Sequence, residues 1–212
     1  MKTTIVKEGY PFIAVAAVLT LGALVFLSWK WAILPFLFTC FFTFFFRSPQ
    51  REIIQDPYVI LSPADGKVMA VEETTEMLFL GGACQKVTIF LSVFDVHVNR
   101  SPIAGEIKFR QYTQGGFRPA YKESVGYENE RHTIGIENQR LSVVVTQIAG
   151  LLARRIVSWR QLGNYLHQGE LYGMIKFGSC TEIFMPLDVE VTVKKGDKVV
   201  GGVSVIGRIL NE

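Results

Sequence analysis

Lys194–Val205 reads KKGDKVVGGVSV, and this stretch carries the clearest fold signal in the chain. A Gly-Asp pair lies between two short runs that favour strands, and a Gly-Gly pair follows before the next valine-rich run. Glycine and aspartate supply the backbone conformations of tight turns, whereas valine packs well on a pleated surface. The stretch therefore predicts short strands joined by tight turns, as in a compact β-sandwich.

The same punctuation recurs upstream. Gly163–Gly173 (GNYLHQGELYG) leads into another strand-like run, and Asp65-Gly66 forms a third turn signal within SPADGKV. This cadence is similar to that of hairpins in lipoyl-type β-domains. For the two C-terminal segments, turn chemistry alone is a sufficient explanation.

Strand-like runs fill most of the chain after residue 50, and no long amphipathic helical period appears there. Val, Ile, Thr and Phe dominate these runs, and Gly, Pro, Asn and Asp separate them. One short helix is predicted around Leu151–Trp159. We predict a mostly-β domain over residues 47–212, after a linker at Arg47–Pro57, with strands at Val59–Leu61, Lys67–Val71, Lys86–Leu91, Gly105–Gln111, His132–Glu137, Leu141–Ile148 and Glu182–Val193.

The N-terminal part differs from the rest in being almost free of charge. Tyr10–Ser28 and Trp31–Phe46 are apolar, and Lys30, which lies between them, is the single charged residue from Tyr10 to Phe46. Each run is near the lower limit of about 17–20 residues for a membrane-spanning helix. The tryptophans beside Lys30 suit a turn at the lipid headgroups. We predict a helical hairpin over residues 1–46 that anchors the chain in the cell membrane.

Charges around the hairpin predict its orientation. Lys2 and Lys7 precede it, Arg47 and Arg51 follow it, and the connecting turn carries only Lys30. Cationic flanks tend to stay in the cytoplasm. Both ends of the hairpin, and the domain that follows, are therefore predicted on the cytoplasmic side.

Composition excludes several other classes. The 212 residues carry a formal net charge of only +3, with 19% charged residues, which argues against a nucleic-acid partner. Cys40, Cys84 and Cys180 form no CxxC pair and no cluster with histidine at metal-ligand spacing. We expect neither a bound metal nor a disulfide.

The segment Gly173–Pro186 (GMIKFGSCTEIFMP) carries the chemistry, because its context is more specific than a lone Gly-Ser turn. Together with five other short motifs in the same order, it resembles the short form of the phosphatidylserine decarboxylase family. The resemblance runs from about Phe44 to Gly202 and rests on Arg47-Ser48-Pro49, Ser62–Val68 (SPADGKV), Phe94–Pro102 (FDVHVNRSP), Glu128–Arg131 (ENER), Ala153–Ile156 (ARRI) and Ile175–Ser179 (IKFGS).

The resemblance implies an enzyme that makes its own pyruvoyl cofactor. The Ser179 hydroxyl would attack the carbonyl of Gly178, and the chain would break into residues 1–178 (β chain) and 179–212 (α chain), which stay associated. Ser179 would become the pyruvoyl group. Its carbonyl would form a Schiff base with phosphatidylserine, release CO2 and yield phosphatidylethanolamine.

The first step needs a base, since a serine hydroxyl is a weak nucleophile at neutral pH. His97 is the predicted base, and Asp65 is predicted to orient its imidazole, giving an Asp65–His97–Ser179 constellation. Asp95 is an alternative orienting acid, and His97 also fits a strand-face histidine paired with Asp95. His132 and His167 are assigned no role.

Two positions depart from the family pattern. Longer members carry a second histidine three residues after the first, where this chain has Arg100. The residue after the serine is commonly Thr or Arg and is Cys180 here, which raises the question of which side chain attacks. The motif register assigns the attack to Ser179.

Two alternatives remain from the sequence. One is a membrane-tethered adaptor with a lipoyl-like domain and no enzymatic activity, which leaves FDVHVNRSP and IKFGS unexplained. The other is a pyruvoyl decarboxylase for a related phosphoserine lipid. The sequence leaves acyl-chain preference and assembly into a homo-oligomer open.

Overall fold

The structure is a computed structural model, and it describes residues 3–116, 129–150, 155–176 and 179–210. The chain forms two compact units, Met1–Arg51 and Glu52–Glu212.

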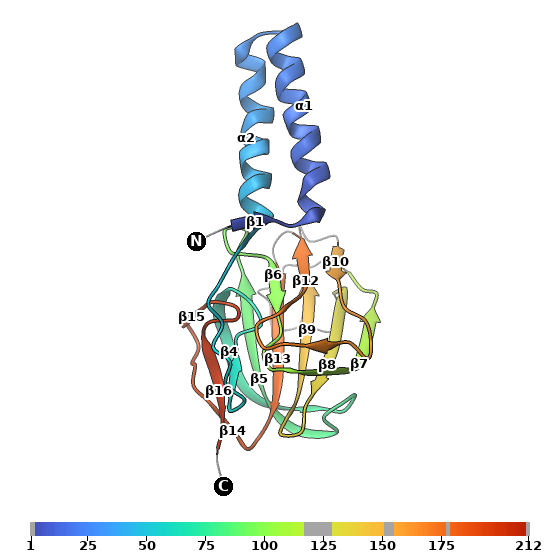
Figure 1. Cartoon of the computed structure of the whole chain (residues 1–212), viewed down its shortest axis with the longest axis vertical. Helices are drawn as coiled ribbons and strands as arrows, with labels where there is room; N and C mark the ends of the chain where they lie inside the picture. Colours follow the sequence, from blue (N-terminus) through green and yellow to red (C-terminus); the bar gives the residue numbers. More distant parts are fainter. Residues whose placement is uncertain (1–2, 117–128, 151–154, 177–178, 211–212) are drawn as a thin grey trace. The chain divides into compact units, whose positions relative to one another are not determined.

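The first unit contains the predicted helical hairpin. After a short 3-10 turn (η1, Lys7–Gly9), α1 spans Tyr10–Phe26 and α2 spans Trp29–Phe45, and the two helices pack side by side (Figure 1). Aromatic rings join them near their lower ends, where Phe12 lies 5.5 Å from Phe42 between ring centroids. The prediction of a helical hairpin is confirmed.

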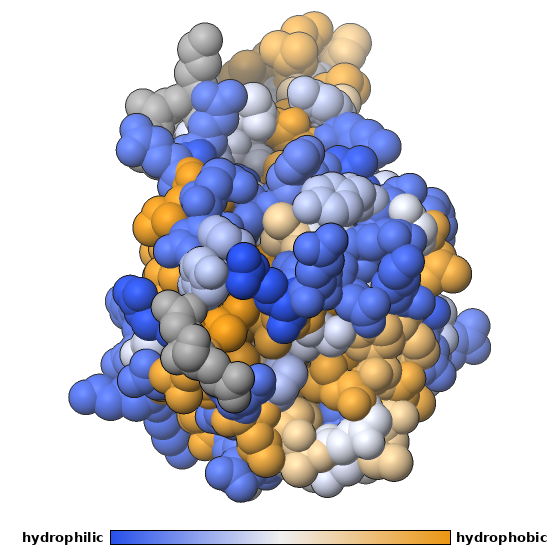
Figure 2. Space-filling view, turned by 60° about the horizontal axis from the view of Figure 1, so that its bottom comes forward, coloured by the Kyte–Doolittle hydropathy of each residue, from blue (hydrophilic) through white to orange (hydrophobic). Residues whose placement is uncertain are grey.

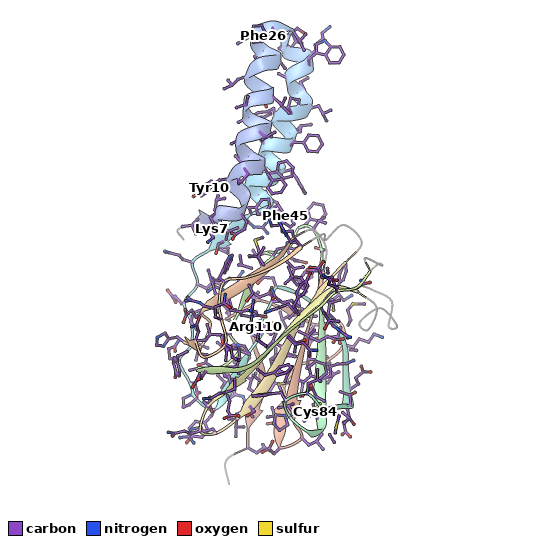
Figure 3. The ribbon with its side chains drawn as sticks, turned by 90° about the vertical axis from the view of Figure 1, so that its right-hand side faces the viewer. Lys7, Tyr10, Phe26, Phe45, Cys84 and Arg110 are labelled. Carbon is purple, nitrogen blue, oxygen red and sulfur yellow. The ribbon has the colours of Figure 1, made fainter. Side chains whose placement is uncertain are left out.

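The hairpin displays apolar side chains outward. Phe26, at the opposite end from Lys7, Tyr10 and Phe45 (Figure 3), is 84% exposed, and Trp31 is 69% exposed. Two helices alone cannot bury so many large side chains against each other. The helical stretch Lys7–Phe26 is long and apolar enough to cross a membrane, and α2 is an apolar helix that is slightly shorter.

Beside the hairpin, β1 (Thr3–Ile5) pairs antiparallel with β2 (Arg47–Pro49). The predicted linker at Arg47–Pro57 was therefore wrong in its first three residues. The antiparallel helices bring the chain segments before α1 and after α2 together, and their backbone groups can then pair as a two-stranded ribbon.

The second unit is mostly β, as predicted, and its sheets are antiparallel. An eight-stranded curled sheet has the order β11-β7-β8-β9-β13-β5-β4-β15, and two three-stranded sheets have the orders β10-β12-β6 and β14-β16-β3 (Figure 1). The strands are β3 (Val59–Leu61), β4 (Gly66–Glu76), β5 (Gly82–Leu91), β6 (Val98–Arg100), β7 (Gly105–Thr113), β8 (Arg131–Glu137), β9 (Ser142–Ala149), β10 (Arg155–Ser158), β11 (Tyr165–Leu166), β12 (Leu171–Lys176), β13 (Ser179–Pro186), β14 (Val189–Val191), β15 (Lys198–Val199) and β16 (Val205–Ile209).

The core follows the period of two that strands impose on their side chains. On β13, for example, Ile183 and Met185 are fully buried in the main apolar cluster with Val145 of β9 and Ile89 of β5. Outside this core, hydrophilic and hydrophobic residues are interspersed on the face shown in Figure 2.

Two local predictions need correction. The helix predicted at Leu151–Trp159 is wrong for Arg155–Ser158, which form β10 because they pair with the edge of β12; residues 151–154 lie outside the described residues. The Gly196-Asp197 turn is present, with Gly196 at a φ of 101°. The strands around it do not pair with each other, since β15 pairs with β4 whereas β14 pairs with β16.

Candidate active site

Ser179 is the first residue of β13 and is completely buried. Among the residues that the structure describes, none forms a hydrogen bond with its Oγ. Buried hydroxyls usually have a partner, because leaving one unsatisfied costs about 1–3 kcal/mol. A buried serine oxygen without such a partner therefore needs an explanation, and a catalytic role is one. Gly178, the predicted residue before the break, lies outside the described residues.

Ser179 is paired within the large sheet, next to a contact of that sheet with a small one. Its Cα pairs with Leu91 of β5 and Ala149 of β9 in the large sheet. Ala149 in turn packs with Ile175 of β12, which belongs to a small sheet. Two residues of sequence separate the end of β12 from Ser179, so the predicted cleavage site joins strands of different sheets.

Cys180 points to the opposite face of β13 from Ser179, because successive side chains of a strand alternate. It is buried, and burial raises the pKa of its thiol far above the ordinary value, with the nearby Glu182 carboxylate adding to the effect. The thiol therefore stays protonated at neutral pH, and only a thiolate is a strong nucleophile. These properties favour Ser179 over Cys180 as the attacking residue.

His97 lies immediately before β6 and is 1% exposed. Its Nδ1 lies 3.0 Å from the backbone oxygen of Asp95. A carbonyl oxygen only accepts hydrogen bonds, so Nδ1 carries the proton and the lone pair of a neutral ring is on Nε2. The His97 backbone oxygen accepts a hydrogen bond from the Ile175 N–H, which ties the histidine to the strand before the cleavage segment.

The two candidate orienting acids have different surroundings. One carboxylate oxygen of Asp95 accepts hydrogen bonds from both the backbone N–H and the hydroxyl of Ser92, so it closes a local turn. Asp65 is half-buried and accepts a hydrogen bond from the Gly201 N–H at 2.8 Å. The next residue, Gly66, has a φ of 153°, and a Cβ there would lie 2.1 Å from the Phe90 carbonyl oxygen. Glycine at position 66 is thus required by close packing.

Asn99 connects the segments that carry the three predicted residues. It lies two residues after His97, and its Nδ2 donates to the backbone oxygen of Pro63, at 3.3 Å, and to the hydroxyl of Thr181, at 3.1 Å. Pro63 precedes Asp65 by two residues, and Thr181 follows Ser179 by two. The fold therefore brings the Asp65, His97 and Ser179 segments together. Direct contact of the Asp65 carboxylate with the imidazole stays a prediction.

The ENER motif supports the strand beside Ser179. Asn129 donates from its side chain to the backbone oxygen of Ala149 at 2.7 Å, and the Glu130 carboxylate accepts from the Ile156 N–H of β10. Both side chains are buried. Glu128 of this motif, and Ala153 and Arg154 of the ARRI motif, lie outside the described residues.

Sequence reasoning missed several buried polar residues near the site, namely Asn99, Gln147, Thr181 and His132. Gln147 lies on β9 with no exposed surface, and His132 lies on β8 and is 2% exposed. Their signal in the sequence was weak. Thr146 and Gln147 are the two polar residues in the otherwise apolar run Val143–Ile148. Polar residues in a strand are equally compatible with an exposed face, so this pair did not indicate a buried site.

His132 should make the stability of the protein depend on pH. Burial, helped by the Arg110 charge, lowers the pKa of His132 from 6.5 to about 4. Between pH 6.5 and about pH 4, the unfolded chain binds more protons than the folded chain. The free energy of unfolding therefore falls as the pH drops through this range. From pH 7 to pH 5 this group should cost about 2 kcal/mol.

Thermal unfolding of the detergent-solubilised protein at the two pH values tests this expectation. His132→Gln should lose less stability than the parent protein on acidification. The control variant His167→Gln, which changes an exposed side chain in a turn, should lose as much as the parent. An equal loss in the parent and His132→Gln would contradict the prediction.

Comparison with known proteins gives a consistent result. A sequence profile described as phosphatidylserine decarboxylase matches residues 38–207. A phosphatidylserine decarboxylase proenzyme of Carboxydothermus hydrogenoformans is 50% identical over 205 residues, which cover 96% of this chain and 95% of the relative. Proteins of the same description from Symbiobacterium thermophilum and Geotalea uraniireducens are 46% and 42% identical, each over 97% of this chain and at least 95% of the relative.

Proposed function

Because the chain belongs to the phosphatidylserine decarboxylase family, we propose that it cleaves itself at Gly178–Ser179 and converts Ser179 into the pyruvoyl group with which it decarboxylates phosphatidylserine. The observation that carries this proposal is the buried Ser179 Oγ, which has no hydrogen-bond partner among the described residues. The segments that carry His97 and Asp65 lie close to the Ser179 segment, as this role requires. The relatives of the chain are described as proenzymes. Family membership favours this enzyme over a non-enzymatic adaptor.

Cleavage begins with proton transfer from the Ser179 hydroxyl to a base. The Oγ then bonds to the Gly178 carbonyl carbon, and the C–N bond breaks as the Ser179 nitrogen takes a proton, which converts the amide into an ester. Loss of the Ser179 α-proton and scission of its Cβ–Oγ bond release Gly178 as a carboxylate. Hydrolysis of the remaining enamine consumes one water and releases ammonia, leaving a keto group at residue 179.

His97 is the proposed base, acting through Nε2. The Asp95 carbonyl on Nδ1 fixes the tautomer and the ring orientation, a task that a carboxylate performs in hydrolase triads. Asp65 is then proposed to stabilise the imidazolium that forms after proton transfer, as a charge on the neighbouring turn. This division of tasks explains how a backbone carbonyl and a carboxylate can both serve one histidine.

The surroundings of residue 179 fit a small covalent carbonyl group. Leu91 and Ala149 flank residue 179 in the sheet, and Ile175 packs against Ala149. His97 lies on the segment hydrogen-bonded to Ile175. The pyruvoyl group supplies a carbonyl that withdraws electrons as carbon dioxide leaves the substrate. His97 is the proposed proton donor to the substrate carbon after that step, which gives phosphatidylethanolamine.

The helical hairpin matches a lipid substrate. We propose that it inserts into the cell membrane and keeps the catalytic domain on the cytoplasmic side. The cations that flank the hairpin support this orientation. Protease added to the outside of intact cells should then leave the domain uncut. Digestion of the domain under those conditions would reverse the proposed orientation.

Intact-mass measurement of the freshly purified, folded protein tests the proposed function. We expect two chains, one ending at Gly178 and one beginning at residue 179. The small chain should be lighter, by the mass of one ammonia molecule, than the same peptide with an N-terminal serine. A single unbroken chain with an ordinary serine would overturn the proposal, as would products that lack decarboxylase activity toward phosphatidylserine in vesicles.

A further inference from the structure

A line of polar side chains runs through the second unit and ends at Thr181, two residues after Ser179. It begins at Arg110 of β7 (Figure 3), whose Nε lies 3.1 Å from Nε2 of His132. His132 Nδ1 lies 3.3 Å from Gln147 Oε1, and Gln147 Nε2 lies 2.8 Å from Asn99 Oδ1. Asn99 then contacts Thr181, at the far end of the line.

The chemistry of the first member sets the direction of every later bond. An arginine Nε can only donate, so Nε2 of His132 accepts and the ring proton is on Nδ1. His132 must then donate to Gln147 Oε1, Gln147 Nε2 donates to Asn99 Oδ1, and Asn99 Nδ2 donates to Thr181 Oγ1. All four bonds point the same way, and such chains strengthen one another in a medium of low dielectric constant.

Stability alone does not account for this arrangement. Asn99, Gln147 and Thr181 have no exposed surface, and His132 has almost none. Burying amide groups is unfavourable unless each is hydrogen-bonded, and an apolar strand core would avoid the problem. The line instead passes through the Asn99 amide, which joins the three segments carrying Asp65, His97 and Ser179. Small displacements there matter most for a reaction between these segments.

We propose that Asn99 is a positioning residue for self-cleavage, that it holds the Ser179 strand in register with His97 through Thr181, and that the Arg110–His132–Gln147 line fixes the orientation of its amide. This inference rests on the proposed function. Both N–H groups of Asn99 are engaged, one on each neighbouring segment, so the amide has a single orientation that satisfies it. A reacting group displaced by about 1 Å can lose about a hundredfold in rate.

The hydrogen bond between Asn99 and Thr181 becomes more important once the chain has been cut. Residue 179 then begins a new chain, and β13 is no longer joined covalently to β12. The pairing of Ser179 with Leu91 and Ala149 holds the strand within the large sheet. The Asn99–Thr181 bond is a side-chain link from this new end to β6, and hence to His97.

Thr181→Val tests the inference because valine keeps the shape of threonine and removes the hydroxyl. The full chain is synthesised without cells in the presence of phospholipid vesicles, pulse-labelled, and followed on denaturing gels. We expect Thr181→Val to slow self-cleavage about tenfold or more, and Thr181→Ser, which keeps the hydroxyl, to remain within about twofold of the parent. Gln147→Met should also slow cleavage, because it removes the hydrogen bond that orients the Asn99 amide.

Thr146→Val is the matched control. Thr146 is a buried threonine on β9 whose hydroxyl bonds to Thr133 at 3.0 Å, on the other face of the sheet. This variant should lower the melting temperature about as much as Thr181→Val, yet cleave at the parent rate. Equal slowing in both valine variants would reduce Asn99 and Thr181 to structural residues and overturn the inference, as would parent-like cleavage of Thr181→Val.

The parent chain separates this inference from the proposed function. If the parent never cleaves, the proposed function fails and the positioning role falls with it. If the parent cleaves and Thr181→Val cleaves equally fast, the proposed function stands and only the positioning role is refuted.

Discussion

Ser179→Ala is expected to leave the chain in one piece and without decarboxylase activity. Alanine lacks the oxygen that must bond to the Gly178 carbonyl carbon. Without that oxygen, the chain cannot break by this route and no keto group forms at residue 179. The variant should fold at least as well as the parent. It removes a buried hydroxyl without a partner among the described residues, a group whose burial costs about 1–3 kcal/mol.

Intact mass and thermal unfolding, measured on the same purified sample, check both halves of this expectation. A single chain with an unchanged or raised melting temperature would show that the chemistry, and not the fold, was lost. Cys180→Ala is the matched control, since it removes the neighbouring buried side chain on the opposite face of β13. That variant should still break. A broken and active Ser179→Ala protein would refute the assignment of the nucleophile.

His97→Gln is expected to slow self-cleavage by about 10²–10⁴-fold, the usual contribution of general acid–base catalysis. Glutamine can keep a hydrogen bond to the Asp95 carbonyl through its amide, but the amide cannot take the proton from Ser179. The half-time of cleavage after pulse labelling measures the effect. Precursor should accumulate at full length and convert slowly.

An exposed histidine supplies the comparison for this second variant. His167→Gln changes a side chain in the turn between β11 and β12, and it should cleave with the half-time of the parent. If His97→Gln also cleaves at the parent rate, His97 is not the base. The position to test next is then Asp65, on the neighbouring turn.

The sequence predicted the larger part of the architecture correctly. The apolar runs before residue 46 form two helices, and the strand at Val59–Leu61 has the bounds that its residues predicted. Patterns of this kind are local, since a run of side chains reports its own period and its own turns. The Ser179 motif was likewise readable, because its residues are adjacent in the chain.

Local patterns failed where a partner strand decided the outcome. Arg155–Ser158 were predicted to be helical and form β10, because β12 offers unpaired backbone groups along its edge. Similarly, Gly196-Asp197 makes the expected turn, but the strands on its two sides join different sheets. Neither pairing partner is adjacent in sequence.

The amino-acid sequence by itself determined the helical hairpin, the mostly-β character of the domain and the identity of the serine expected to react. Only the tertiary structure showed that the Asp95 backbone oxygen bonds to the His97 ring, and that Asn99 reaches Pro63, 36 positions away, and Thr181, 82 positions away. The physical reason is that a hydrogen bond depends on distances of about 3 Å between particular atoms. Sheet order and strand register set those distances, and neither is encoded in the residues that form the bond.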